Sequence, residues 1–429
     1  MMTTRFFLLL SVLFFAGQLH AQPLAERLES LAFDSIRPFE IEKDSYRSAW
    51  ELFLSQPLDH DRPEGERFLQ RLVLRHNDFN KPVVLVTEGY AAHYALYPRF
   101  DHELAVKLDA NLVVVEHRFF GRSQPDSLVW EALTLQNMAA DLHRITTLLK
   151  QIYPEGWLST GISKGGQTSI YYRYFYPDDV QASVPYVAPL NFSDEDERVY
   201  HFLDTVGTAD CRNRIRDIQQ RLLAEQAVFR PMFADSAARR ELSFEMVGGI
   251  EKAFEYNVLE FSFAFWQWYP FPCNQLPQPD VSVDSLYTVF IAATGYDFFA
   301  DQGIMGYQPF FYQALTEMGM YSYRTEGFEN VLRYVYEPGF KHTLPEGVEI
   351  AYDPTLSLEV DNWLSAFGNN MLYIYGAYDA WSATAVHTGD QTNAVKLLLP
   401  EGSHRTRLRH FSEDEQEKAI SLLREWLGL

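Results

Sequence analysis

Residues 159–166 read Ser-Thr-Gly-Ile-Ser-Lys-Gly-Gly, and this stretch determines the predicted fold class. Gly161, Ser163 and Gly165 match the Gly-x-Ser-x-Gly pattern, a sharp turn that raises a serine hydroxyl above the edge of a sheet. Side chains at the two glycine positions would collide across such a turn. A helix-compatible stretch from Lys164 to Tyr176 follows. The sequence therefore predicts a strand, a strained turn and a helix, with Ser163 as a candidate nucleophile.

An acid and a histidine follow Ser163 in the chain order that this turn usually accompanies. Asp379 comes shortly after the apolar run Met371–Tyr375, and His404 comes shortly after the run Ala394–Leu399. A serine hydroxyl needs a base to remove its proton, and that base needs a carboxylate to fix its tautomer. Either residue alone could be a turn cap or a solvated loop histidine. All three at successive strand ends favour a catalytic triad.

The rest of the chain alternates strand-like and helix-like segments. The region 39–77 suggests antiparallel strands, whereas 82–87, 112–115 and 182–187 are short runs that fit central parallel strands. Helix signals include Thr134 before a helical apolar stripe, and a capping box formed by Ser412 and Glu415 near the end. This alternation predicts an α/β fold with a mostly parallel sheet, which together with the serine turn is α/β-hydrolase architecture.

The alternation stops in the middle of the chain. Phe254–Phe271 contains nine aromatic residues in eighteen. We predict a first half of the hydrolase domain over 22–190, a helical cap insertion over 191–364, and a second half over 365–429. Most aromatic rings of such a stripe should pack inside the cap, and a few could face the substrate.

Residues 1–21 have the features of a secretory signal peptide, with Arg5 ahead of a short apolar core. The predicted location is therefore the periplasm or the extracellular space. We expect no integral membrane segment, because no later stretch approaches the length that spans a bilayer. The 58 acidic residues exceed the 36 basic ones, giving a formal net charge of −22. Such a charge argues against nucleic acid as a partner.

The chain contains two cysteines, Cys211 and Cys273, both inside the predicted insertion. Export to an oxidising compartment favours a disulfide between them over two free thiols. The cysteine and histidine spacing does not fit a zinc site, and no dinucleotide or phosphate motif is visible. We therefore expect no metal and no cofactor.

Several motifs together resemble one family. They are Gln56-Pro57-Leu58-Asp59-His60, the run Glu116–Ser123 (Glu-His-Arg-Phe-Phe-Gly-Arg-Ser), the Ser-Lys-Gly-Gly turn, Gly376-x-x-Asp379-x-Trp381-Ser382 and Phe263–Gln267. This set is similar to the secreted bacterial tripeptidyl aminopeptidases, serine peptidase family thirty-seven, relatives of prolylcarboxypeptidase and dipeptidyl peptidase II. One departure is Ala380, where the family commonly has proline, and it bears on the rigidity of the loop rather than on the chemistry.

The resemblance implies an exported serine exopeptidase that acts on peptide substrates near the N-terminus through an acyl-enzyme. It implies Ser163 as nucleophile, Asp379 as orienting acid and His404 as general base. The oxyanion hole would combine the amide of Lys164 with an amide near Gly89 or Tyr90. Candidate substrate contacts are Glu88, Trp266, Gln267 and Trp381. Glu88 and Glu116 follow core strands and either could hold a substrate ammonium, although we expect Glu116 to form a structural ion pair with Arg118.

Two other functions use the same features. A carboxylesterase or lipase could carry the same triad, because the triad does not distinguish an ester from an amide. A surface protein that binds without catalysis is the third possibility, and the complete triad argues against it. The sequence leaves open the oligomeric state and the residue preferred at the scissile bond.

Overall fold

The structure is a computed structural model that describes residues 23–42, 45–278 and 280–429. The predicted signal peptide at 1–21 lies outside the described residues.

A nine-stranded sheet forms the centre of the described chain, in the order β1-β2-β3-β5-β4-β6-β7-β8-β9. The first three strands are antiparallel, β3 pairs antiparallel with β5, and the strands from β5 to β9 pair in parallel. The strand bounds are Ser35–Phe39, Ser48–Pro57, Arg67–His76, Val83–Thr87, Asn111–Val115, Trp157–Ile162, Ala182–Tyr186, Leu372–Gly376 and Val395–Leu399, for β1 to β9. This topology confirms the predicted α/β-hydrolase fold.

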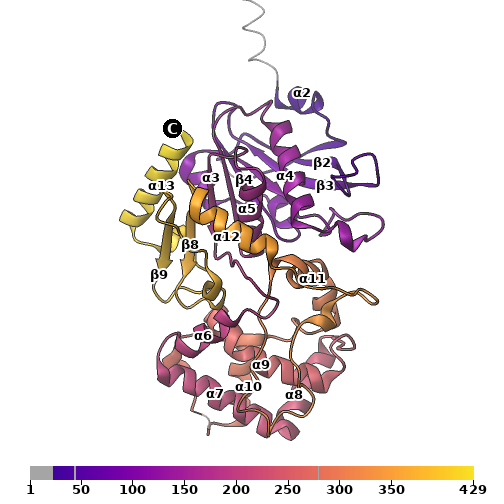
Figure 1. Cartoon of the computed structure of the whole chain (residues 1–429), viewed down its shortest axis with the longest axis vertical. Helices are drawn as coiled ribbons and strands as arrows, with labels where there is room; N and C mark the ends of the chain where they lie inside the picture. The colour runs from indigo at the N-terminus through magenta and orange to yellow at the C-terminus, as the bar shows by residue number, and fades with distance from the viewer. Residues whose placement is uncertain (1–22, 43–44, 279) are drawn as a thin grey trace, which may run out of the picture.

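Helices cover both faces of the parallel strands (Figure 1). The helices α4 (Leu135–Leu149), α5 (Lys164–Phe175) and α12 (Thr355–Phe367) share one buried apolar core, and α3 (Glu103–Leu108) and α13 (Glu413–Leu427) share the other. Every residue of β4, β5 and β7 is buried, which is why these strands are mostly apolar in sequence. A short helix, α2 (Leu24–Glu29), precedes β1.

Side-chain hydrogen bonds cap the amino-terminal ends of the two helices whose starts the sequence predicts. The hydroxyl of Thr134 accepts a hydrogen bond from the amide of Asn137 at 3.1 Å, at the start of α4. Ser412 and Glu415 form a reciprocal capping box at the start of α13.

The inserted helices gather at the end of the molecule opposite α2 (Figure 1). They are α6 (Glu197–Thr205), α7 (Ala209–Ala224), α8 (Gln226–Arg239), α9 (Ile250–Trp268) and α10 (Val283–Thr294), and we call this group the cap. Helix α11 (Asp301–Gln313) continues into a single π-helical turn, Ala314–Met318, and leads back toward the sheet. Helix α9 contacts α7, α8 and α10 and forms the centre of the cap, which explains its aromatic composition.

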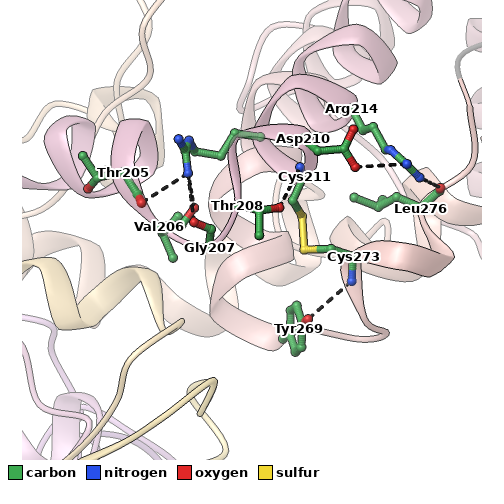
Figure 2. Close-up of a disulfide and its surroundings, with 11 residues drawn as sticks. Thr205, Val206, Gly207, Thr208, Asp210, Cys211, Arg214, Tyr269, Cys273 and Leu276 are labelled. Carbon is green, nitrogen blue, oxygen red and sulfur yellow. Dashed lines mark hydrogen bonds and ion pairs between the residues drawn. A yellow bond between two sulfur atoms is a disulfide. The ribbon is translucent and has the colours of Figure 1, made fainter.

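A disulfide joins Cys211, in the first turn of α7, to Cys273, shortly after the end of α9 (Figure 2). The amide of Cys273 donates to the hydroxyl of Tyr269 at 3.3 Å, and the side chain of Arg214 donates to the carbonyl of Leu276 at 3.1 Å. These contacts fix the chain that leaves α9 against the start of α7.

The predicted end of the insertion at residue 364 falls inside α12. This helix packs on α5 rather than on the cap, and the hydroxyls of Ser357 and Tyr171 are 2.8 Å apart. We therefore propose that the second half of the sheet domain begins near Thr355. The helical pattern of α12 resembles that of the cap helices, so the sequence alone could not separate them.

Candidate active site

Ser163 occupies the turn between β6 and α5 with φ of 57° and ψ of −122°. The neighbouring glycines make this turn possible: a Cβ on Gly161 would lie 2.1 Å from the carbonyl oxygen of Gly165. The amide of Ser163 donates to the carbonyl of Tyr186 on β7 at 2.9 Å. The predicted strand, strained turn and helix are thus present, with Ser163 at the carboxyl end of a central strand.

Asp379 and His404 lie beside the next strands of the sheet. Asp379 follows β8 and is fully buried, and His404 follows β9. Nδ1 of His404 lies 2.7 Å from Oδ2 of Asp379, while Oδ1 of Asp379 accepts from the amide of Trp381 at 3.1 Å. A carboxylate at Nδ1 holds the proton on that nitrogen, so Nε2 is the nitrogen that can accept one. Because β6, β8 and β9 run parallel, all three residues lie at the carboxyl-terminal edge of the sheet, and the contact observed among them is that between His404 and Asp379.

The end of cap helix α9 contacts this histidine. The carbonyl of Gln267 accepts from the amide of His404 at 2.8 Å, and the ring of Trp268 lies edge-on to the imidazole at 5.6 Å. Trp268 was not among the predicted site residues. It directly follows Gln267 in the sequence, but the pattern did not show which aromatic residue of α9 meets the histidine loop.

The loop after β4 packs directly on the start of α5. A Cβ on Gly89 would lie 2.6 Å from Cβ of Lys164, so only glycine allows this approach. Among the described residues, the amides of Lys164 and Tyr90 donate to no protein group. The amide of Gly89 lies near the carboxyl of Glu88 and lowers its pKa, but it too donates no hydrogen bond to a described protein group. Gly89 and Tyr90 are therefore both candidates for the second donor.

A buried lysine–histidine pair supports this loop. Nζ of Lys164 lies 3.0 Å from Nε2 of His117, and Nδ1 of His117 lies 2.7 Å from the carbonyl of Arg118. A carbonyl can only accept, so Nδ1 carries the proton and Lys164 donates to Nε2. Burial holds the pKa of Lys164 and that of His117 well below their usual ranges. The Lys164 ammonium also lies 5.9 Å from the ring centre of Tyr90.

Glu88, a predicted substrate contact, lies at the same place. Its carboxyl accepts a hydrogen bond from the hydroxyl of Tyr94. Burial raises the pKa of Glu88 to about 7, and the hydrogen bond from the Tyr94 hydroxyl opposes this rise. Glu88 is therefore beside the residue that follows Ser163, close to where a scissile bond would lie.

The two predicted tryptophans differ in their surroundings. Trp266 is fully enclosed and packs on Phe265, Tyr269 and on Tyr378 of the loop after β8, so it joins the cap to that loop and is not exposed to a substrate. Trp381 is 8% exposed and packs between cap residues and the loop that carries Asp379.

The predicted ion pair between Glu116 and Arg118 is wrong. Glu116 is fully buried, pairs with Arg71, and accepts from the amides of Ala92 and Arg122 at 2.9 and 2.7 Å. These contacts satisfy its carboxylate, so Glu116 has no capacity left for a substrate ammonium. Both residues lie beyond the end of β5, where Arg118 is directed to Asp141 and to the carbonyls of Leu58 and Ala132 instead.

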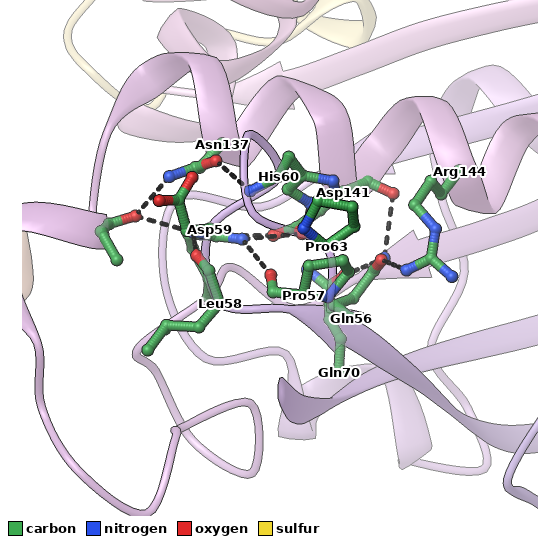
Figure 3. Close-up of polar contacts among 12 residues, drawn as sticks. Gln56, Pro57, Leu58, Asp59, His60, Pro63, Gln70, Asn137, Asp141 and Arg144 are labelled. Carbon is green, nitrogen blue, oxygen red and sulfur yellow. Dashed lines mark hydrogen bonds and ion pairs between the residues drawn. The ribbon is translucent and has the colours of Figure 1, made fainter. Parts of the chain in front are cut away.

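Arg118 belongs to a separate polar cluster beside the end of β2, where it pairs with Asp141 at 2.7 Å. Figure 3 shows the same cluster from the Gln56–His60 motif, in which Nε2 of His60 lies 2.7 Å from Asp141. The amide of His60 also donates to the side chain of Asn137 at 2.9 Å. This motif therefore fastens the end of β2 to α4 and is structural.

Two negative findings apply to the described residues. No group of three or more His, Cys, Asp or Glu side chains in this part of the chain is arranged to hold a metal ion. In the same part of the chain, no helix is both long and apolar enough to cross a membrane.

The sheet topology and the serine turn define an α/β hydrolase. The family model of PS-10 peptidase S37 matches residues 23–429, so the chain belongs to this family and is a serine peptidase. It is 32% identical over 382 residues to a prolyl tri/tetrapeptidyl aminopeptidase of Streptomyces mobaraensis, covering 87% of this chain and 79% of that protein.

Two further similarities are more distant. A prolyl carboxy peptidase like protein of Caenorhabditis elegans is 31% identical over 157 residues, covering 33% of this chain and 31% of that protein. A solved proline iminopeptidase of Mycobacterium smegmatis aligns over 92% of this chain and 99% of its own, at 13% identity and a TM-score of 0.40.

Proposed function

We propose that the protein is a tripeptidyl aminopeptidase that uses Ser163, His404 and Asp379 as its catalytic triad. The observation that carries this proposal is the 2.7 Å contact between His404 and Asp379 at the sheet edge that also bears Ser163. The family membership and the relative named a prolyl tri/tetrapeptidyl aminopeptidase support the substrate class.

In this mechanism the hydroxyl of Ser163 attacks the scissile carbonyl carbon while Nε2 of His404 takes its proton. The tetrahedral intermediate collapses, the C–N bond breaks, and His404 returns the proton to the leaving amine. Water then attacks the acyl-enzyme and gives a proton to His404. The bond between the carbonyl carbon and the Ser163 oxygen breaks, His404 returns the proton to that oxygen, and the peptide leaves with a free carboxyl group. Asp379 stays ionised and stabilises the imidazolium that forms twice in the cycle.

The negative charge on the carbonyl oxygen needs donors that are already in place. Among the described residues, the amides of Lys164, Gly89 and Tyr90 donate to no protein group, and they lie on two segments that Gly89 allows to touch. Two such donors stabilise the developing oxyanion more than the ground-state carbonyl.

The cap supports an exopeptidase. Because α9 ends on His404 through Gln267 and Trp268, the cap restricts the space around the triad. We further propose that residues 1–21 direct export of the protein. We also propose that the enzyme prefers proline or a small apolar residue before the scissile bond, by analogy with the relatives that are named for prolyl peptides.

The test compares tripeptidyl naphthylamides, their N-acetylated forms and short acyl esters on the same preparation, with mass spectrometry of products from a peptide mixture. We expect release of tripeptides from free N-termini and covalent labelling of Ser163 by a fluorophosphonate. Equal cleavage of free and acetylated peptides, or cleavage at internal bonds, would contradict the exopeptidase. Rapid ester hydrolysis without peptide hydrolysis would indicate an esterase.

A further inference from the structure

Glu260 is a buried carboxyl in the middle of cap helix α9 without a cationic partner. It is 5% exposed, and the hydroxyls of Tyr321 and Tyr323 both donate to its Oε2, at 2.9 and 2.7 Å. Within the described part of the chain, no group donates to Oε1, and no lysine, arginine or histidine pairs with this carboxyl. One oxygen is therefore oriented by two donors and the other is free.

Burying a carboxyl without a cationic partner lowers the stability of the folded protein, so a function is expected to compensate for it. Burial raises the pKa of Glu260 to about 8, and the two tyrosine hydroxyls only partly oppose this rise. Glu255, five residues earlier in α9, shows the structural alternative: it is buried too, but accepts from the amides of Arg333, Tyr334 and Val335. Glu255 has a complete set of donors for fixing a loop, whereas Glu260 does not.

Aromatic rings connect the surroundings of Glu260 to the loop that carries Asp379. The ring of Tyr321 stacks on Phe263 at 3.7 Å, and both rings lie edge-on to Trp381 at 5.2 Å. The amide of Trp381 in turn donates to Asp379. A continuous aromatic cluster thus connects the Glu260 carboxyl to the loop that orients the catalytic histidine.

The distance along α9 fits a short peptide. Glu260 precedes Gln267, whose carbonyl contacts His404, by seven residues, and seven helical residues rise by about 10 Å. Three extended peptide residues span roughly 10 Å. A tripeptide with its scissile carbonyl at Ser163 would have its amino group at about this distance from the reaction.

We propose that Glu260 receives the free α-ammonium of the tripeptide on Oε1, with Tyr321 and Tyr323 holding its other oxygen. This proposal rests on the proposed function and names the residue behind its N-terminal selectivity. The ammonium supplies the charge that the buried carboxylate lacks. An acetylated N-terminus carries no charge, so it would leave Glu260 without its cation.

Glu88 is the rival carboxyl. It lies beside the Gly89–Lys164 contact, next to the scissile position, and accepts a hydrogen bond from the hydroxyl of Tyr94. An ammonium at Glu88 would suit release of a single residue, whereas Glu260 suits release of three.

The experiment measures the ratio of kcat/KM for a free tripeptidyl naphthylamide to that for its N-acetylated form. We expect Glu260→Gln to keep the side-chain volume and to lower this ratio by about tenfold or more, mainly through KM of the free substrate. Hydrolysis of a short acyl ester, which has no amino group, should stay within about twofold of wild type, because the triad is untouched.

Two variants complete the design. Glu317→Gln is the matched control: Glu317 is a second glutamate whose pKa burial raises to about 7, it accepts from the amide of Leu135, and its variant should keep the wild-type ratio. Tyr323→Phe removes one donor to Oε2 and should lower the ratio by a smaller factor, which keeps the proposal testable if Glu260→Gln does not fold.

The outcomes separate the two proposals. If wild type prefers free substrates and both Glu260→Gln and Tyr323→Phe keep that preference, the assignment of Glu260 is overturned while the aminopeptidase stands. Loss of the preference in Glu88→Gln instead would transfer the role to Glu88. If wild type itself does not distinguish free from acetylated substrates, the proposed function fails.

Discussion

At the residue scale, the backbone of Ser163 determines where its hydroxyl points. Its φ of 57° places a non-glycine residue in a region that costs about 1–3 kcal/mol. The close approach of Gly161 and Gly165 and the hydrogen bond to Tyr186 hold the turn in this state. Strain at a single serine between two glycines is consistent with a nucleophile presented at a sheet edge.

The triad assignment predicts that Ser163→Ala and His404→Ala each abolish nearly all peptide hydrolysis without unfolding the protein. Because triad residues act as a unit, the double variant should be scarcely slower than either single variant. Asp379→Asn should also lose several orders of magnitude in kcat, since an amide favours the wrong tautomer of His404. Steady-state kinetics on folded variants, checked by circular dichroism, would reject the assignment if Ser163→Ala turned over normally.

The pair of Lys164 and His117 predicts an energetic coupling. Lys164→Met leaves the stem that packs on Gly89 but leaves Nε2 of His117 without a donor, which should cost about 1–3 kcal/mol of unfolding free energy. His117→Phe should strand the Lys164 amine similarly. The double variant removes both polar groups and should cost less than the sum of the two.

Urea denaturation of all four proteins measures this double-mutant cycle. Additive losses would mean that the 3.0 Å contact contributes nothing to stability.

At the scale of elements, α9 connects the cap to the loop that carries His404. Its amino-terminal half packs within the cap, and its last turn contacts His404. The disulfide fixes the chain just beyond this last turn to α7 (Figure 2). The position of the histidine loop thus depends on the end of one cap helix.

Because the disulfide lies just beyond the last turn of α9, we expect its removal to loosen that end of the helix. Cys211 and Cys273 are 62 residues apart, and closing a loop of this size stabilises the folded state by about 4 kcal/mol in the chain-entropy model. Cys211→Ser/Cys273→Ser should increase amide hydrogen exchange at the end of α9 and the start of α7 and reduce activity. Strand β5 is the internal control and should exchange as in wild type. Uniformly faster exchange would show that the bond stabilises the whole fold instead.

The sequence predicted the elements whose signals are local. The strand before Asp379 is an apolar run that is buried throughout, and the strand before Ser163 is buried up to Gly161, whereas the strand before His404 is only partly buried. The partners of Glu116, the enclosure of Trp266 and the contact of Trp268 with His404 depend on how distant segments meet. Helical periodicity shows that a face is buried but not which neighbour buries it.

At the scale of the whole molecule, two sets of buried titratable groups change the folding stability in opposite directions as pH rises. Burial raises the pKa of Glu88, Glu260 and Glu317 to between about 7 and 8. Their contribution to stability is complete below pH 4.5 and is lost as pH rises through 7 to 8. Burial also lowers the pKa of His76, His102 and His342 to about 4, so their contribution is present above pH 6.5 and is lost as pH falls toward 4.

These opposite slopes nearly cancel between pH 4.5 and 6.5, so they predict a stability plateau over that range and a loss of stability above it. Above it, only the carboxyls titrate, each contributing a slope of at most about 1.4 kcal/mol per pH unit, and the formal net charge of −22 adds self-repulsion. Glu260→Gln removes one titrating group, so the unfolding free energy of the variant should fall less than that of wild type between pH 6.5 and 9. Guanidinium denaturation at pH 4, 5, 6.5, 8 and 9 measures the unfolding free energy on both sides of this plateau, with Glu413→Gln on the exposed face of α13 as the surface control. Parallel pH curves for wild type and Glu260→Gln would mean that Glu260 is already ionised in the free enzyme, with a pKa near that of the unfolded chain.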